Sequence, residues 1–231
     1  MNNLEHRGAY AATRARINGL LADADSTGSA ALNVAACPAW SVADLTAHLA
    51  GVARALVERD RPGPDVQAWV DNHVAVRRGR SVASLLEEWN EFAAGFEDLI
   101  EAKGGSFSGL LYDIVAHEHD LRHALGRPGA RSSDGVMLSM QVERSILERD
   151  LAANGMPGVV VRSADGEWGA GGSPAVTLDL SHRPHGTFEL IRLLGSRRSL
   201  NQMSAQPWEG DWQAILPGLA HMDLPAADLV E

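Results

Sequence analysis

Apolar residues recur at helical spacing through most of residues 1–155. This pattern predicts helices over residues 4–24, 41–60, 66–78, 81–103, 110–125 and 134–153. The second of these has the clearest beginning, because Ser41 is followed three residues later by Asp44, a short version of the capping box. Breaks rich in Pro and Gly at residues 62–64 and 126–129 separate neighbouring helices. The N-terminal part of the chain is therefore predicted to be helical.

After residues 155–158, GMPG, the apolar pattern changes from helical to β-like. Short apolar runs over residues 159–162 and 175–180 predict strands, and residues 187–194 predict a helix. The segment after Ser199 is a candidate for one further short helix. The change of pattern predicts two domains of an α+β protein, a helical domain over residues 1–155 and a small α/β domain over residues 156–231.

The composition is that of a globular protein with an acidic surface. The chain has 231 residues, 45% of them hydrophobic, and a formal net charge of −10, with Lys103 as its only lysine. Net acidity repels phosphate backbones, so nucleic acid is not an expected partner. No apolar run reaches the roughly 20 residues that span a bilayer, and neither a membrane nor a secretory signal is expected. A single cysteine, Cys37, excludes an internal disulfide, so we expect a cytoplasmic protein.

Candidate chemistry gathers on two of the predicted helices. Residues four apart on a helix lie one above the other, so Asp113 and His117 project from the same side. Helical winding places both of them and Asp120 beside the apolar stripe, facing neighbouring helices, and His48 occupies a similar flank of the earlier helix. Two histidines and one carboxylate form a ligand set for catalytic zinc that other first-row metals also accept.

Structural roles compete with this interpretation. An Asp and a His four residues apart on a helix are more commonly a surface pair worth a few tenths of a kcal/mol. A lone histidine beside an apolar face, such as His48, is more commonly a hydrogen-bonded core residue than a ligand. Spacing alone does not join His48 to the pair on the later helix.

Two motifs resemble those of a known family. Residues 37–49, CPAWSVADLTAHL, resemble a long signature of the mycothiol-dependent maleylpyruvate isomerase family, within the DinB-like metalloenzymes. Residues 113–121, DIVAHEHDL, are similar to that family's second motif, in which an acidic residue precedes a histidine by four positions. Asp113 stands where the family usually has Glu, so its carboxylate reaches about one methylene less far. The resemblance implies that His48, Asp113 and His117 form one metal site.

The C-terminal part of the chain extends the resemblance. Residues 188–199, FELIRLLGSRRS, followed by Gly210 and Asp211, are similar to the family's C-terminal helix, its Gly-Arg element and its closing Gly-Asp. Ser196 replaces the usual Gly, so the functional arginine is either Arg197 or Arg198, with Arg197 preferred. Both arginines are alternatively solvated charges at a helix end.

The resemblance implies a fold and a chemistry. The fold is a DinB-like four-helix bundle holding the ion, joined to a small C-terminal α/β domain resembling sterol-carrier folds, with the active cleft between them. The cofactors are a divalent metal, zinc first and nickel or another first-row metal second, and mycothiol, whose sulfur would bind the metal as a thiolate. The partners are this small-molecule thiol and a small electrophilic substrate, isomerised or joined to sulfur. Arg197 would pair with a substrate carboxylate, and Asp120 would orient His117 or a bound water.

Two other functions stay open at this point. The first is a non-catalytic small-molecule or lipid-binding protein with a structural metal or none. The second is a DinB-like metal-dependent hydrolase that activates water at the same three ligands. Cys37 is more plausible as a packing residue than as a nucleophile, because it lies beside Pro38 and near Trp40. The sequence indicates neither the substrate nor the oligomeric state.

Overall fold

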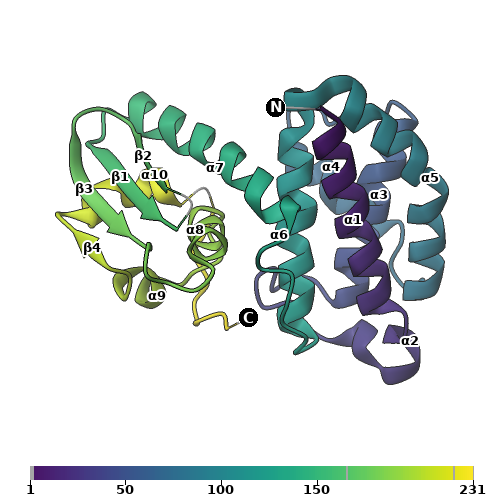
Figure 1. The fold of residues 1–231 in the computed structure, drawn as a ribbon. Coiled ribbons are helices and arrows are strands. Elements are labelled where there is room, and N and C mark those ends of the chain that lie inside the picture. The colour runs from purple at the N-terminus through teal and green to yellow at the C-terminus, as the bar shows by residue number, and fades with distance from the viewer. Residues whose placement is uncertain (1–2, 165, 221, 231) are drawn as a thin grey trace. The chain divides into compact units, whose positions relative to one another are not determined.

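The chain folds into two units, each with its own core (Figure 1). The computed structural model describes residues 3–164, 166–220 and 222–230. A helical unit ends at Gly129, and the C-terminal unit spans Ala130–Val230. The division lies before the helix α7, Asp134–Ala153, and not near residue 156 as the change of sequence pattern predicts. The reason is packing, since Leu147 and Leu151 of α7 are fully buried in the core of the C-terminal unit.

Four long helices make up most of the helical unit, and they pack in pairs. Their bounds are α1 Asn3–Leu21, α3 Val42–Val57, α5 Val82–Lys103 and α6 Ser108–Ala124. Both α1 and α3 pack against α5 and α6. The shorter elements are α2 Ala24–Thr27, η1 Ser29–Ala31, α4 Val66–Ala75 and η2 Gly104–Phe107, and α4 packs on α3.

Capping side chains and apolar stripes explain why these helices form where they do. The capping box expected at Ser41 is present, with the Ser41 hydroxyl accepting from the Asp44 amide at 3.1 Å and the Asp44 carboxylate accepting from the Ser41 amide at 3.0 Å. Ser81 caps α5 in the same way by accepting from the Ser84 amide at 3.2 Å. The largest fully buried side chains of the unit come from all four long helices and include Ile17, Leu45, Trp89, Phe96 and Ile114.

A small mixed sheet is the centre of the C-terminal unit (Figure 1). Its strands are β1 Gly158–Ser163, β2 Gly166–Ala170, β3 Pro174–Asp179 and β4 Trp208–Glu209, in the order β2-β1-β3-β4. The central strands β1 and β3 are parallel, and each edge strand pairs antiparallel with its neighbour. The other elements are α7, α8 Gly186–Leu194, α9 Leu200–Ser204, η3 Trp212–Ile215 and α10 Leu216–Leu219.

One glycine of this unit has a clear structural requirement. Gly210 follows β4 with φ +87°, and a Cβ added there would lie 2.3 Å from the backbone oxygen of Ala175 on β3. Only glycine combines that dihedral angle with so close an approach. The Gly210 position therefore keeps the short edge strand against the sheet.

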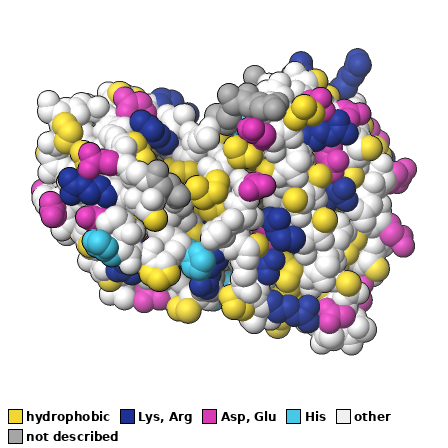
Figure 2. Space-filling view, in the orientation of Figure 1, with side chains coloured by type: hydrophobic (Ala, Val, Ile, Leu, Met, Phe, Trp, Pro, Cys, Tyr) yellow, Lys and Arg dark blue, Asp and Glu magenta, His cyan; other side chains and the backbone are white. Residues whose placement is uncertain are grey.

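The two units together make an α+β protein, as the sequence pattern predicts. Acidic and basic side chains are interspersed over the visible face of each unit (Figure 2). Within the described ranges, no helix combines the length and the apolar character that crossing a membrane requires.

Candidate metal centre

His48 lies in the middle of α3, on a face that the preceding segment covers. The chain folds back before α3, where the Val34 amide donates to the Trp40 carbonyl at 3.0 Å. This places the half-buried Trp40 ring beside His48, with ring centroids 5.2 Å apart. The His48 side chain is only 5% exposed. A helix start fixed by Ser41 therefore sets which residue of α3 packs under Trp40.

Asp113 and His117 lie one turn apart on α6, and both face His48. The Asp113 carboxylate lies 3.3 Å from His48 Nε2 through Oδ2 and 3.4 Å from His117 Nε2 through Oδ1. The two imidazole rings meet edge to face with centroids 5.1 Å apart. The structure thus brings together the three residues that the motifs suggest, with ligand atoms all within 4.8 Å of one another.

These distances suit one small cation. Two ligand atoms about 2.0–2.1 Å from a tetrahedral zinc ion lie about 3.3 Å apart. Charge-assisted hydrogen bonds between the same groups are normally shorter, about 2.7–2.9 Å. The spacings at Asp113, 3.3 and 3.4 Å, match the first geometry better than the second. The shorter carboxylate of Asp113 therefore already reaches both histidines.

The buried ring nitrogens of His48 also support a metal site. Its Nδ1 is buried and makes no hydrogen bond to any described residue, and its Nε2 faces Asp113. A core histidine with a purely structural role normally has its buried nitrogens satisfied. Two imidazoles and a carboxylate provide three ligands, and a catalytic zinc site keeps a fourth position for water or substrate. The Asp113 side chain is 34% exposed, so a further ligand can approach the site.

Electrostatics couple the three groups tightly. Burial opposes ionisation of Asp113, but the neighbouring His117 and His48 hold the pKa of that carboxyl well below its usual range. Burial likewise disfavours the charged form of His117, but Asp113 and then Asp120 raise the pKa of its imidazole well above its usual value. The site therefore holds the ionised Asp113 carboxylate between two imidazoles, and a metal ion would bind there in place of the His117 proton.

Asp120 lies behind His117 and away from the three facing atoms. Its Oδ2 is 3.0 Å from His117 Nδ1, and the residue is 1% exposed. A carboxylate at one imidazole nitrogen fixes the tautomer so that the other nitrogen is free to bind a metal. Cys37 also approaches His117, and Cys37, His117 and Asp120 form a second group with ligand atoms within 4.8 Å. The 3.0 Å contact is that of an Nδ1–H hydrogen bond, which favours Nε2 as the metal-binding atom.

Arg197 and Arg198 belong to the C-terminal unit, in the turn after α8. Arg198 forms a two-pronged ion pair with Glu189, at 2.7 Å from Nε and 2.9 Å from Nη2. Arg197 donates from Nη1 to the Gly195 carbonyl at 2.9 Å. Ser196, which directly precedes Arg197, has φ +57°, in the left-handed region that favours glycine. Its hydroxyl accepts a hydrogen bond from the Met222 amide at 3.1 Å. That dihedral angle suits glycine, the residue that the resemblance leads us to expect at position 196.

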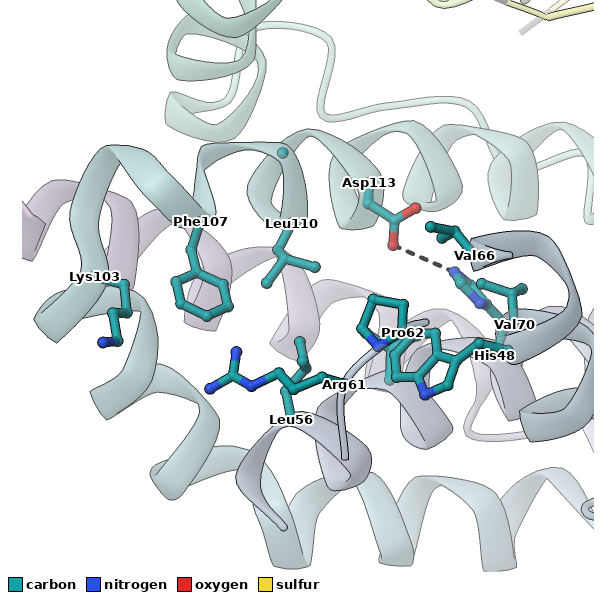
Figure 3. Close-up of a pocket in the computed structure, with 13 residues that line it drawn as sticks. His48, Leu56, Arg61, Pro62, Val66, Val70, Lys103, Phe107, Leu110 and Asp113 are labelled. Atoms are coloured by element: carbon teal, nitrogen blue, oxygen red, sulfur yellow. Dashed lines mark hydrogen bonds and ion pairs between the residues drawn. The ribbon is translucent and has the colours of Figure 1, made fainter. Parts of the chain in front are cut away.

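A pocket of about 850 Å³ in the helical unit opens onto the candidate site (Figure 3). His48 and Asp113 form part of its wall, and α3, α4, α5 and α6 all contribute to it. Arg61 and Lys103 also line the pocket, and sequence reasoning did not select either of them. Neither belongs to a motif or a spacing pattern, because one lies in the loop after α3 and the other at the end of α5.

Comparisons with known proteins agree with the motifs. Residues 10–122 match the family model of the mycothiol maleylpyruvate isomerase N-terminal domain. That range includes His48, Asp113, His117 and Asp120, and it lies within the helical unit. Neither the curated proteins nor the solved structures yielded a match. The family match supports the resemblance of the two motifs at residues 37–49 and 113–121 to the mycothiol maleylpyruvate isomerase N-terminal domain.

Proposed function

We propose that the protein is a metal-dependent enzyme that uses mycothiol, and that it isomerises a small electrophilic carboxylate or transfers sulfur to it. The observation that carries this proposal is the convergence of His48, Asp113 and His117, with ligand atoms within 4.8 Å, in a domain of the mycothiol maleylpyruvate isomerase N-terminal family. In this proposal the long helices form a DinB-like four-helix bundle, and the C-terminal unit is related to sterol-carrier folds.

The three side chains have distinct roles in this proposal. His48 and His117 would each offer Nε2 to the ion, and Asp113 would offer a carboxylate oxygen, with zinc as the first candidate and nickel as the second. When bound, the ion would supply Lewis-acid chemistry that favours the thiolate form of mycothiol. Asp120 would act as a positioning residue, because its contact with Nδ1 keeps the His117 ring turned toward the ion.

Arg197 is our candidate for the substrate carboxylate. A planar guanidinium suits a carboxylate because two parallel N–H groups can donate to its two oxygens. Arg198 already directs such a pair of donors at Glu189, whereas Arg197 donates to the Gly195 carbonyl. The two arginines are 4% and 6% exposed, so burial does not distinguish them. The engagement of Arg198 with Glu189 is the reason for assigning the role to Arg197.

The metal site is tested by the metal content of protein purified without a His-tag. Zinc and nickel are quantified by elemental analysis in the wild type, His48→Ala and His117→Ala, with His123→Ala as a matched control on α6 outside both candidate groups. We expect one ion per chain in the wild type and the control. Removing one of three ligands should lower metal affinity by at least tenfold, because second-shell losses alone cost about 10–100-fold. Unchanged metal content in both ligand variants would overturn the site.

The thiol is tested by calorimetric titration of mycothiol into zinc-loaded and zinc-free protein. Binding that requires zinc supports the proposed function. Zinc retained without mycothiol binding would favour the hydrolase that activates water at the same ligands. Mycothiol turnover with an activated alkene, followed as consumption or regeneration of the thiol, separates a transferase from an isomerase.

A further inference from the structure

The pocket beside the candidate metal site has an apolar body. Its volume of about 850 Å³ is that of a site for a small organic molecule. Side chains from three helices form its apolar walls, among them Val52 and Leu56 from α3, Val66 and Val70 from α4, and Leu110 from α6. In Figure 3, Leu110 lies between Asp113 and Lys103, and Val66 and Val70 lie beside His48.

The cations that line this pocket are Arg61 and Lys103, and both are exposed. Figure 3 shows their charged groups at the end of the pocket away from His48 and Asp113. Neither side chain forms a hydrogen bond or an ion pair with any described residue, although many other arginines of the helical unit are paired. In a chain of net charge −10, two unpaired cations at the end of an apolar pocket are a local reversal of charge.

The acidic side chain that directly precedes Arg61 in the sequence is already engaged. Asp60 accepts a hydrogen bond from Trp69 Nε1 at 3.2 Å, and its carboxylate lies 3.5 Å from His73 Nε2. These contacts hold Asp60 on the Trp69–His73 side of α4, where the two rings pack edge to face. The charge of Arg61 is therefore available to a ligand.

We propose that this pocket binds a small amphiphilic carboxylate, with its head group at Arg61 and Lys103 and its apolar chain along the walls toward the metal site. The positive charges of Arg61 and Lys103 attract the carboxylate and set this orientation, which leaves the far end of the chain beside His48 and Asp113. Binding of the carboxylate stands on the pocket alone. Its interpretation as a substrate rests on the proposed function and would place the substrate carboxylate at Arg61 and Lys103 instead of at Arg197.

The probe is decanoate, with decan-1-ol as its uncharged counterpart. Calorimetric titrations use the full-length protein without metal, so that the carboxylate has no ion to bind, and are repeated with zinc. We expect decanoate to bind more tightly than decan-1-ol. Decanoate affinity should fall as salt rises from 0.02 to about 0.5 M, because screening weakens exposed charges, whereas decan-1-ol affinity should not fall.

Charge variants identify the head-group end. Exposed ion pairs are worth about 0.2–1 kcal/mol, so Arg61→Gln and Lys103→Gln should each weaken decanoate about threefold, and the double variant about tenfold. Binding of decan-1-ol should be unchanged in all three. The matched control is Arg78→Gln, which removes the same charge from an exposed position of the helical unit that lines neither this pocket nor the neighbouring one with Arg61 and Lys103. Val66→Glu, at an exposed wall position, should weaken both probes.

The outcomes separate this proposal from the proposed function. Absence of decanoate binding, or equal losses in Arg78→Gln and Arg61→Gln, would overturn the carboxylate site while leaving the metal and mycothiol results standing. Decanoate binding with the expected variant pattern supports the pocket even in a protein that binds no mycothiol. Binding to phosphatidylglycerol vesicles without binding to decanoate would overturn it in favour of a membrane surface.

Discussion

Glu88 on α5 is the centre of a buried ion-pair cluster in the helical unit. It is 6% exposed and accepts from Arg77 Nη2 at 2.6 Å, with further contacts to Arg80 and, at 3.4 Å, to Arg54. Burial opposes its ionisation, but the hydrogen bonds from Arg77 and Arg80 lower the pKa of Glu88 to about 2. Because this pKa lies below the usual value of 4.5, ionised Glu88 stabilises the fold above pH 4.5 and loses that contribution as pH falls toward 2.

Replacing Glu88 should therefore have a pH-dependent effect on stability. Glu88→Gln leaves two guanidinium groups without their carboxylate, and we expect a loss of about 3 kcal/mol in the free energy of unfolding at pH 7. The difference between wild type and variant should shrink as pH is lowered from 4.5 toward 2. Urea unfolding at a series of pH values measures it. Glu91→Gln, at an exposed position of the same helix, is the control and should change stability little.

Individual site residues could be predicted from the sequence only where they share a helix or a motif. Asp113 and His117 are related by one helical turn, and helical spacing alone places them on one side of α6. His48 joins them only through the fold of α3 against α6, which the family motif implied and spacing did not. Arg61 and Lys103 meet because a loop and a helix end converge, and no local pattern encodes that approach.

At the scale of elements, the close contact between α3 and α4 depends on one glycine. A Cβ added to Gly51 of α3 would lie 2.8 Å from the Cβ of His73 on α4. Since α4 also carries Val66 and Val70 of the pocket wall, the separation of these helices sets the width of the pocket.

Gly51→Ala should therefore be destabilising although alanine is the better helix former. We expect a loss of about 1–3 kcal/mol from overpacking. Gly19→Ala in α1, where no atom lies within 4 Å of an added Cβ, should instead gain up to about 1 kcal/mol. Thermal unfolding of the two variants measures these effects, and a gain in both would show that α3 and α4 are not in close contact.

Elements with strong local signals could be predicted, and those that depend on pairing could not. Ser41 and the following apolar stripe predict the start of α3, and the bounds of α7 agree with the predicted 134–153. By contrast, β2 contains two glycines in the segment GEWGA, and β4 is only two residues long. These strands form because their backbones pair with β1 and β3, and such pairing leaves little local pattern.

At the scale of the whole molecule, the division into units shows what a change of pattern can miss. The β-like pattern begins after residue 155, but α7 precedes it and belongs to the C-terminal core. The apolar pattern of a helix shows which face is buried but does not indicate which unit packs against that face. Long-range packing decides the boundary, and it is not visible in periodicity.

Metal binding should act unequally on the two units. All three proposed ligands come from α3 and α6, and an ion that binds only the folded protein stabilises it by about 2.7 kcal/mol at a hundredfold excess over Kd. Zinc should therefore slow amide hydrogen exchange in α3 and α6 more than in the sheet β1–β4. Exchange measured by mass spectrometry with and without zinc tests this. Equal slowing in both units, or slowing that persists in His117→Ala, would contradict a local site.

Lys103 carries the only side-chain amine of the sequence, and it lies exposed at the cationic end of the pocket. A reagent that modifies lysine side chains therefore has a single target in this protein. A fluorophore or a cross-linker attached there would stand beside the apolar walls, without any need to remove competing lysines. The scarcity of lysine makes the pocket a natural position for a covalent reporter of what enters it.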